Sequence, residues 1–190
     1  VDGNEIIWQE SFGYADFENN VKVDSSTIFG IGSVSKVFTG TAIMQLYEDG
    51  KLDIDNEYSV YSPEFKIKNR YDSTTPVTVR MLLDHHSGLP ADIARGVFSL
   101  QPKPFRTITE LVDKEYSPYP PNYIYSYSNI GYSLLGIIIE NVANETYENF
   151  IEGNIFNPLA MKSACFISDN STRFSKGYDE NGDLRVEYGI

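Results

Sequence analysis

Two side chains that could share one chemical task stand three positions apart in the segment FGIGSVSKVFTG, residues 29–40. Residues i and i+3 of a helix face the same side, with Cβ atoms about 5–6 Å apart, so a helix here would bring Ser33 and Lys36 together. A serine hydroxyl needs a neighbouring base to act as a nucleophile at neutral pH. The spacing therefore indicates a serine that attacks carbonyl groups.

The start of such a helix would add a second chemical advantage. Its first backbone N–H groups have no partner within the helix and carry the positive end of the helix dipole. These groups suit the oxyanion that forms when Ser33 Oγ attacks a carbonyl carbon. Ser35 is not equivalent, because its i+3 residue is Phe38. On the spacing alone, the simpler alternative is that Ser33 is a helix N-cap and Lys36 is a solvated side chain.

The apolar pattern predicts the helix that would position these groups. We expect it over residues 34–47, followed by Gly50 as the residue that ends it. The residues of its apolar face are Phe38, Ala42, Ile43, Leu46 and Tyr47.

Further helices are expected in the segments TVRMLLDHHSGLP, TITELVDKEY, NIGYSLLGIIIENVA and TYENFIEGNIF. The first has Thr78 as a predicted N-cap and Gly88 as a predicted stop. The third is strongly apolar and should begin near Asn129 or Ile130, after the stiff proline-rich segment SPYPPN.

Extended segments are expected at both ends of the chain. Residues 4–14 place apolar side chains among polar neighbours, and Asn181–Gly182 between extended residues predicts a hairpin. The sequence therefore predicts an α+β fold in which residues 1–31 and 165–190 supply strands of an antiparallel sheet. Residues 32–164 would form a mainly helical block inserted between those strands.

Six segments in order carry a family resemblance: TIFGIGSVSKVFTG, GKLDID, LLDHHSGLP, YSYSNIGYSLLGIIIE, PLAMKSACF and KGYDENGD. Together they resemble the serine β-lactamase and penicillin-binding protein superfamily, most closely its class C β-lactamase-like branch. That branch includes D-alanyl-D-alanine carboxypeptidases, D-aminopeptidases and esterases. The resemblance extends over essentially all 190 residues and implies a single β-lactamase/transpeptidase-like domain, 1–190, with a truncated sheet.

The resemblance also implies four catalytic residues. Ser33 would be the acylated nucleophile, Lys36 would help to deprotonate it, Tyr127 would be the general base or proton shuttle, and Asn129 would bind substrate and Lys36. The physical chemistry is compatible, because a cation at Lys36 and a nearby helix N-terminus both favour a tyrosinate. Outside the resemblance, Tyr127 would be read as a packing residue and Asn129 as a helix cap.

One family motif does not occur in the sequence. The family's Lys/His-Thr/Ser-Gly triplet lies on a strand beside the site, and Lys176–Gly177 does not match it. We therefore expect an N-terminal fragment that has little or no activity alone and that associates through apolar surface exposed by the truncation. Loss of one oxyanion-hole donor typically lowers kcat about 10²–10³-fold.

Composition excludes several other classes of protein. The formal net charge is −12, which disfavours nucleic acid and anionic membrane surfaces as partners. There is one cysteine, so no intrachain disulfide or cysteine-based zinc cluster can form. His85 and His86 are adjacent, and neighbouring helix positions point about 100° apart, so a metal site is not expected. No transmembrane segment and no cofactor are predicted.

The sequence thus predicts a serine acyl hydrolase that forms a Ser33 acyl-enzyme with a β-lactam, a D-amino-acid peptide or a small ester. The alternative is a penicillin- or peptide-binding sensor module that has the same fold but does not hydrolyse its ligand. By resemblance, the expected location is secreted, periplasmic or at the surface of a bacterium, although the sequence shows no signal peptide.

Overall fold

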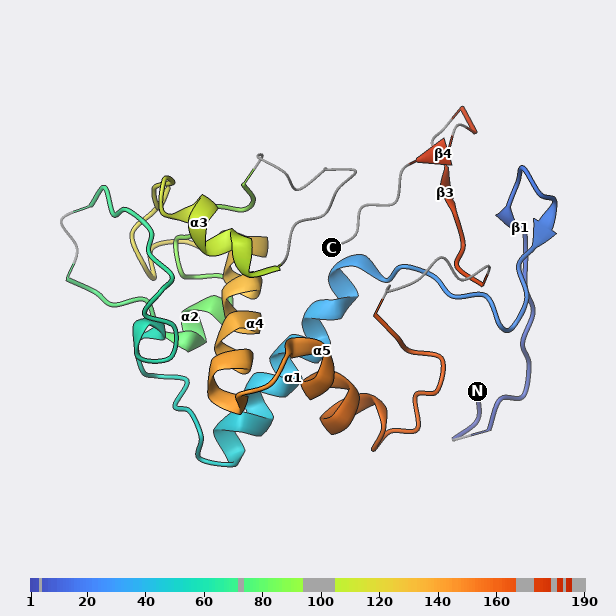
Figure 1. Cartoon of the computed structure of the whole chain (residues 1–190), viewed down its shortest axis with the longest axis horizontal. Helices are drawn as coiled ribbons and strands as arrows, with labels where there is room; N and C mark the ends of the chain where they lie inside the picture. Colours follow the sequence, from blue (N-terminus) through green and yellow to red (C-terminus); the bar gives the residue numbers. More distant parts are fainter. Residues whose placement is uncertain are drawn as a thin grey trace. The chain divides into compact units, whose positions relative to one another are not determined.

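The computed structural model divides the chain into two compact units, one of Val1–Gly32 with Ser163–Gly189 and one of Ser33–Lys162. It describes residues 1–3, 5–71, 74–93, 105–166, 173–178, 181–182 and 184–185 (Figure 1). The assignment of all 190 residues to one domain stays a prediction.

Helices dominate the Ser33–Lys162 unit. Figure 1 shows α1, α4 and α5 side by side, and α2 also contacts α4. The helical elements are η1 (Gly32–Val34), α1 (Ser35–Glu48), η2 (Tyr58–Val60), α2 (Val79–Leu83), η3 (Phe105–Thr107), α3 (Ile108–Val112), α4 (Asn129–Ala143), α5 (Tyr147–Ile151) and η4 (Glu152–Phe156).

Helix α1 confirms the expected helix after Ser33. Ala42, Ile43 and Leu46 are fully buried, as the apolar pattern predicts. The helix ends at Glu48. Gly50, just beyond it, adopts a left-handed φ of 69°, and Lys51 N donates to Leu46 O at 2.9 Å. This is the hydrogen bond of a Schellman C-cap, which glycine favours. The expectation that Tyr47 belongs to the buried face was wrong: its side chain is 40% exposed. Tyr47 is one position beyond Leu46, and that step rotates a side chain by about 100° around a helix.

Helix α4 confirms the strongly apolar helix and its predicted start. Ser128 caps it, with Oγ accepting from Gly131 N at 2.9 Å. Asn144 ends it in a left-handed conformation with φ 57°. The buried residues of α4 are Ile130, Gly131, Leu134, Leu135, Gly136, Ile137, Ile138 and Ile139, so this helix forms the centre of the helical core.

Helix α2 starts as predicted but ends earlier. Thr78 caps it, with Oγ1 accepting from Met81 N at 3.3 Å. Gly88 was expected to stop this helix, and that was wrong: α2 ends at Leu83, and His85 already has a left-handed φ of 63°. Gly88 has a different role. A Cβ there would lie 2.3 Å from Tyr119 O, so glycine permits a close backbone contact.

The strands lie in the other unit and are short. β1 (Tyr14–Asp16) pairs antiparallel with β2 (Val21–Lys22), and β3 (Gly177–Tyr178) pairs antiparallel with β4 (Leu184–Arg185). The second pair confirms the predicted hairpin. An isolated parallel bridge also joins Ile28 to Phe174.

The strand expected over residues 4–14 was wrong for most of its length, because the paired segment begins only at Tyr14. Ile6, Ile7 and Trp8 are each at least 68% exposed. They follow the apolar pattern of a strand, yet no neighbouring strand pairs with them in the part of the chain that the structure describes. The helices and two antiparallel pairs together confirm the α+β class.

Candidate active site

The four side chains expected to carry chemistry come together in the Ser33–Lys162 unit. Lys36 Nζ donates to Ser33 Oγ at 3.2 Å and to Asn129 Oδ1 at 2.6 Å. Tyr127 OH donates to Ser33 Oγ at 2.7 Å. Ser33 and Tyr127 are separated by 94 positions in the sequence. The contact of α1 with α4 therefore creates the cluster.

Ser33 lies in η1, which runs directly into α1. Gly32 precedes it with a left-handed φ of 51°, which a residue with a side chain rarely adopts. Lys36 lies in the first turn of α1, and its Nζ reaches Ser33 Oγ at 3.2 Å. The predicted proximity of the two groups is confirmed.

The Lys36 ammonium dominates the electrostatics of the cluster. Its Nζ lies 5.0 Å from the centroid of the Tyr127 ring and 5.5 Å from that of Tyr132. Hydrogen bonding with Lys36, and then with Ser33, lowers the pKa of Tyr127 below its ordinary value. A lowered pKa makes a phenolate base more accessible at neutral pH.

Asp92 extends the cluster, although it was not among the site residues predicted from the sequence. Asn129 Nδ2 donates to Asp92 Oδ1 at 2.8 Å, while Asn129 Oδ1 accepts from Lys36. These two contacts use both ends of the amide and fix its orientation. No periodic pattern or motif marks Asp92, because its partner lies 37 positions away.

A pair of loops holds the start of α4, and we call residues 85–91 and 122–129 the paired loops. The cap Ser128 Oγ also donates to Pro90 O at 2.6 Å. Backbone bonds join Asn122 N to His86 O, Ser126 N to His85 O and Asn129 N to Ala91 O, each at 2.8 Å. Tyr127 thus lies in a segment whose backbone is fixed on both sides.

The Beta-lactamase family profile matches residues 1–185. The chain belongs to the Beta-lactamase family. Its fold is β-lactamase/transpeptidase-like, with the helices and small antiparallel pairs described above, and the sheet is not closed.

Several known proteins are similar to this chain along most of its length. Protein flp of Staphylococcus aureus is 30% identical over 189 residues, covering 98% of this chain and 38% of that protein. A penicillin-binding protein homologue from Pyrococcus abyssi, described as octameric, is 33% identical with a TM-score of 0.80, covering 98% of this chain and 45% of that one. A D-amino acid amidase from Ochrobactrum anthropi is 27% identical with a TM-score of 0.75, covering 93% of this chain and 53% of that one. The chain thus spans well under two thirds of the length of the curated relative.

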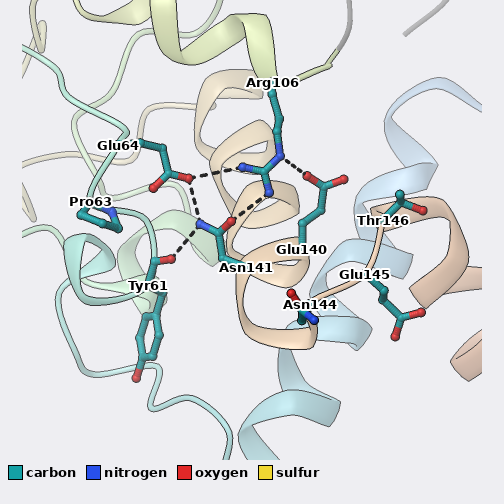
Figure 2. Close-up of a pocket in the computed structure, with 9 residues that line it drawn as sticks. All are labelled: Tyr61, Pro63, Glu64, Arg106, Glu140, Asn141, Asn144, Glu145 and Thr146. Carbon is teal, nitrogen blue, oxygen red and sulfur yellow. Dashed lines mark hydrogen bonds and ion pairs between the residues drawn. The ribbon is translucent and has the colours of Figure 1, made fainter.

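A pocket in the same unit is lined by residues other than those of the cluster. The pocket has a volume of about 650 Å³. Figure 2 shows that Arg106 contacts two glutamates and an asparagine in it. Its lining residues are Tyr61, Pro63, Glu64, Arg106, Glu140, Asn141, Asn144, Glu145 and Thr146. None of the four predicted site residues is among them, and the lining contains no activated nucleophile.

His85 and His86 have different partners. The His85 ring faces Tyr127, with centroids 4.5 Å apart, whereas His86 Nδ1 lies 3.2 Å from Asp84 Oδ1. Among the described residues, no group of three or more histidine, cysteine or acidic side chains has the geometry to hold a metal ion. Within the same residues, no helix has both the length and the apolar character of a membrane span.

Proposed function

We propose that this chain carries the nucleophile and its activating groups in a serine acyl hydrolase of the Beta-lactamase family. The observation that carries the proposal is the contact of Ser33 Oγ with both Lys36 Nζ and Tyr127 OH. A hydroxyl in contact with a cation and a phenol of lowered pKa has the groups it needs to lose its proton.

In the proposed reaction, Ser33 Oγ attacks a carbonyl carbon as its proton passes to the Tyr127 phenolate. The resulting tetrahedral intermediate collapses when the Tyr127 phenol protonates the leaving nitrogen or oxygen, which leaves an ester on Ser33. Water then attacks that ester and gives its proton to Tyr127. The second tetrahedral intermediate collapses as the Tyr127 phenol returns that proton to Ser33 Oγ, which releases the acid product and restores the phenolate. Lys36 stabilises the phenolate throughout, and Asn129 holds Lys36 in place.

We propose a β-lactam, a D-amino-acid peptide or amide, or a small ester as substrate. The amidase and penicillin-binding relatives support this range, since their names refer to a D-amino acid amide and to a β-lactam. By the same resemblance, we propose a secreted, periplasmic or cell-surface location in a bacterium.

The test is covalent labelling of the intact protein by a fluorophosphonate and by a panel of β-lactams and p-nitrophenyl esters, followed by mass spectrometry. We expect an adduct on Ser33 that Ser33→Ala abolishes. Ser35→Ala is the matched control and should still be labelled, because Ser35 has Phe38 rather than a lysine at i+3. Failure to label, or labelling that survives Ser33→Ala, would contradict the proposal. A β-lactam or ester adduct that forms but is never released would instead identify the binding or sensor module.

A further inference from the structure

His85 is a nearly buried histidine that the proposed reaction does not use. Its side chain is 9% exposed and lies in the first of the paired loops, just beyond α2. Its ring lies among three tyrosine rings, with centroids at 4.5 Å for Tyr127, 5.1 Å for Tyr132 and 5.7 Å for Tyr125. The nearest of the three is the proposed base.

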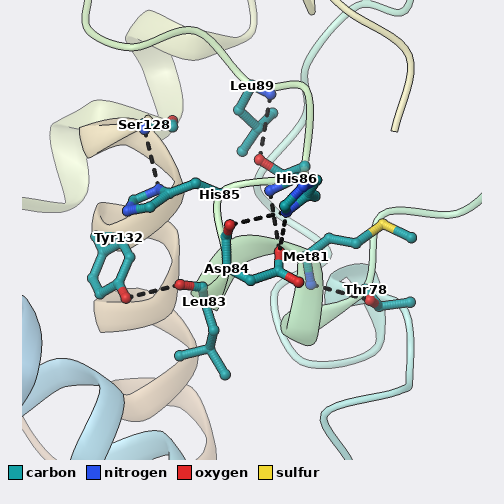
Figure 3. Close-up of polar contacts among 10 residues, drawn as sticks. Thr78, Met81, Leu83, Asp84, His85, His86, Leu89, Ser128 and Tyr132 are labelled. Atoms are coloured by element: carbon teal, nitrogen blue, oxygen red, sulfur yellow. Dashed lines mark hydrogen bonds and ion pairs between the residues drawn. The ribbon is translucent and has the colours of Figure 1, made fainter. Parts of the chain in front are cut away.

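Hydrogen bonds to His85 flank Tyr127 in the chain. Ser126 N donates to the His85 carbonyl at 2.8 Å, and Ser128 N donates to His85 Nδ1 at 3.2 Å. Figure 3 shows the second bond, with the imidazole directed at the Ser128 amide. One residue therefore fixes the backbone before and after Tyr127, and its ring also contacts the phenol.

The bond from Ser128 defines the state of the imidazole. Nδ1 must keep a lone pair to accept it, so the ring is neutral and its proton lies on Nε2. The charged groups around it agree: burial, and then the positive charge of Lys36 on α1, lower the pKa of His85, with His86 acting in the same direction and Asp84 opposing them. Among the described residues, the three tyrosine rings also face the imidazole.

We propose that neutral His85 is a positioning residue for Tyr127, acting through the Ser128 amide and through the face of the phenol ring. This inference rests on the proposed role of Tyr127 as the base. Protonation or removal of the imidazole would leave the buried Ser128 N–H without its acceptor and would free the phenol to move from Ser33 and Lys36.

Two variants of nearly equal size separate the acceptor from simple space filling. In His85→Asn, the amide oxygen occupies roughly the place of Nδ1, and asparagine tolerates the left-handed backbone. In His85→Leu, the shape is similar but no acceptor exists. Two quantities are measured in the intact protein: the rate of fluorophosphonate labelling of Ser33, and the pKa of Tyr127 by NMR of labelled tyrosine.

We expect His85→Leu to slow labelling about 10- to 100-fold, as small misplacements of catalytic groups do, and to raise the pKa of Tyr127 toward its ordinary value. His85→Asn should restore both the labelling rate and the pKa to near wild type. In the wild type, nitrogen NMR should show His85 Nδ1 without a proton at neutral pH.

The outcomes separate the two proposals. Suppose that Ser33 is not labelled in the wild type, while the pKa of Tyr127 still rises in His85→Leu and stays near wild type in His85→Asn. In that case the hydrolase proposal fails and the positioning role stands. If labelling is normal and the Tyr127 pKa is the same in all three proteins, the positioning role is overturned. Should the leucine variant not fold, the folded asparagine variant decides the question. A wild-type labelling rate and a wild-type pKa of Tyr127 in that variant support the positioning role. A changed labelling rate or a changed pKa overturns it.

Discussion

At the scale of single residues, the position of Lys36 governs the candidate site. One ammonium contacts the proposed nucleophile, the amide of Asn129 and the face of the Tyr127 ring. A serine has two acceptor lone pairs, and here they receive hydrogen bonds from Lys36 and Tyr127. The positive charge of Lys36 therefore contacts each of the other three side chains of the cluster.

Replacing Lys36 with methionine should raise the pKa of Tyr127. A nearby cation favours the phenolate and lowers a phenol's pKa, so its removal should move the value up toward about 10. Labelling of Ser33 should then require a higher pH. The measurement is the NMR titration of Tyr127, with Lys51→Met as control, because Lys51 is an exposed lysine that pairs with Asp49. An unchanged Tyr127 pKa in the Lys36 variant would show that the ammonium does not set it.

The sequence predicted the part of this site that depends on local geometry. Ser33 and Lys36 were found from their spacing, whereas Asn129 was assigned to the site only through the family resemblance. Tyr127 was selected among 14 tyrosines only through the family resemblance. Asp92 and the partners of His85 were missed, because contacts across about 40 positions leave no local pattern.

At the scale of secondary-structure elements, helix starts were predicted better than helix ends. Thr78 and Ser128 are capping residues whose side chains bond amides within their own helix, so the signal is local. The end of α2 instead depends on His85, which turns away from the helix to meet the other paired loop. Strands are harder to predict than helix ends, because a strand forms only when a second strand pairs with it. Residues 4–14 have the apolar pattern of a strand but are unpaired for most of their length.

Gly88→Ala should destabilise the protein by more than about 1 kcal/mol, because alanine is strained at a φ of 72° and its Cβ would lie 2.3 Å from Tyr119 O. Urea unfolding measures the change. Gly40→Ala is the control: it lies inside α1, its new Cβ would lie an ordinary 3.9 Å from Leu83, and it should stabilise the helix by about 0.5–1 kcal/mol. A Gly88 variant as stable as the wild type would mean that the paired loops can move away from residues 119–120 without a loss of stability.

At the scale of the whole molecule, Arg106 joins segments that are far apart in the chain. Its Nε lies 2.7 Å from Glu140 Oε2, its Nη1 lies 3.5 Å from Glu64 Oε1, and its Nη2 donates to Asn141 Oδ1 at 2.8 Å (Figure 2). The Glu140 side chain is only 12% exposed. The pocket described above is therefore best explained as a structural junction of the loop at residue 64, η3 and the end of α4.

Arg106→Met should lower the free energy of unfolding by about 1–2 kcal/mol, since it leaves Glu140 nearly buried without a cation. Lys51→Met again serves as control and should change stability by less than about 0.5 kcal/mol, because its ion pair is solvated. Chemical denaturation of both variants provides the comparison. Equal stabilities would show that the junction contributes no more than a surface pair.

The backbone bonds of the paired loops have a consequence for how this chain can diversify. Tyr127 is held through main-chain amides and through His85, whereas Tyr123 is 69% exposed and Ile124 is 38% exposed. Side chains at positions 123 and 124 can therefore change without displacing the phenol. Mutational drift at these two positions would alter the surface near the reactive group while its machinery stays intact, which is a simple route to new substrate preferences.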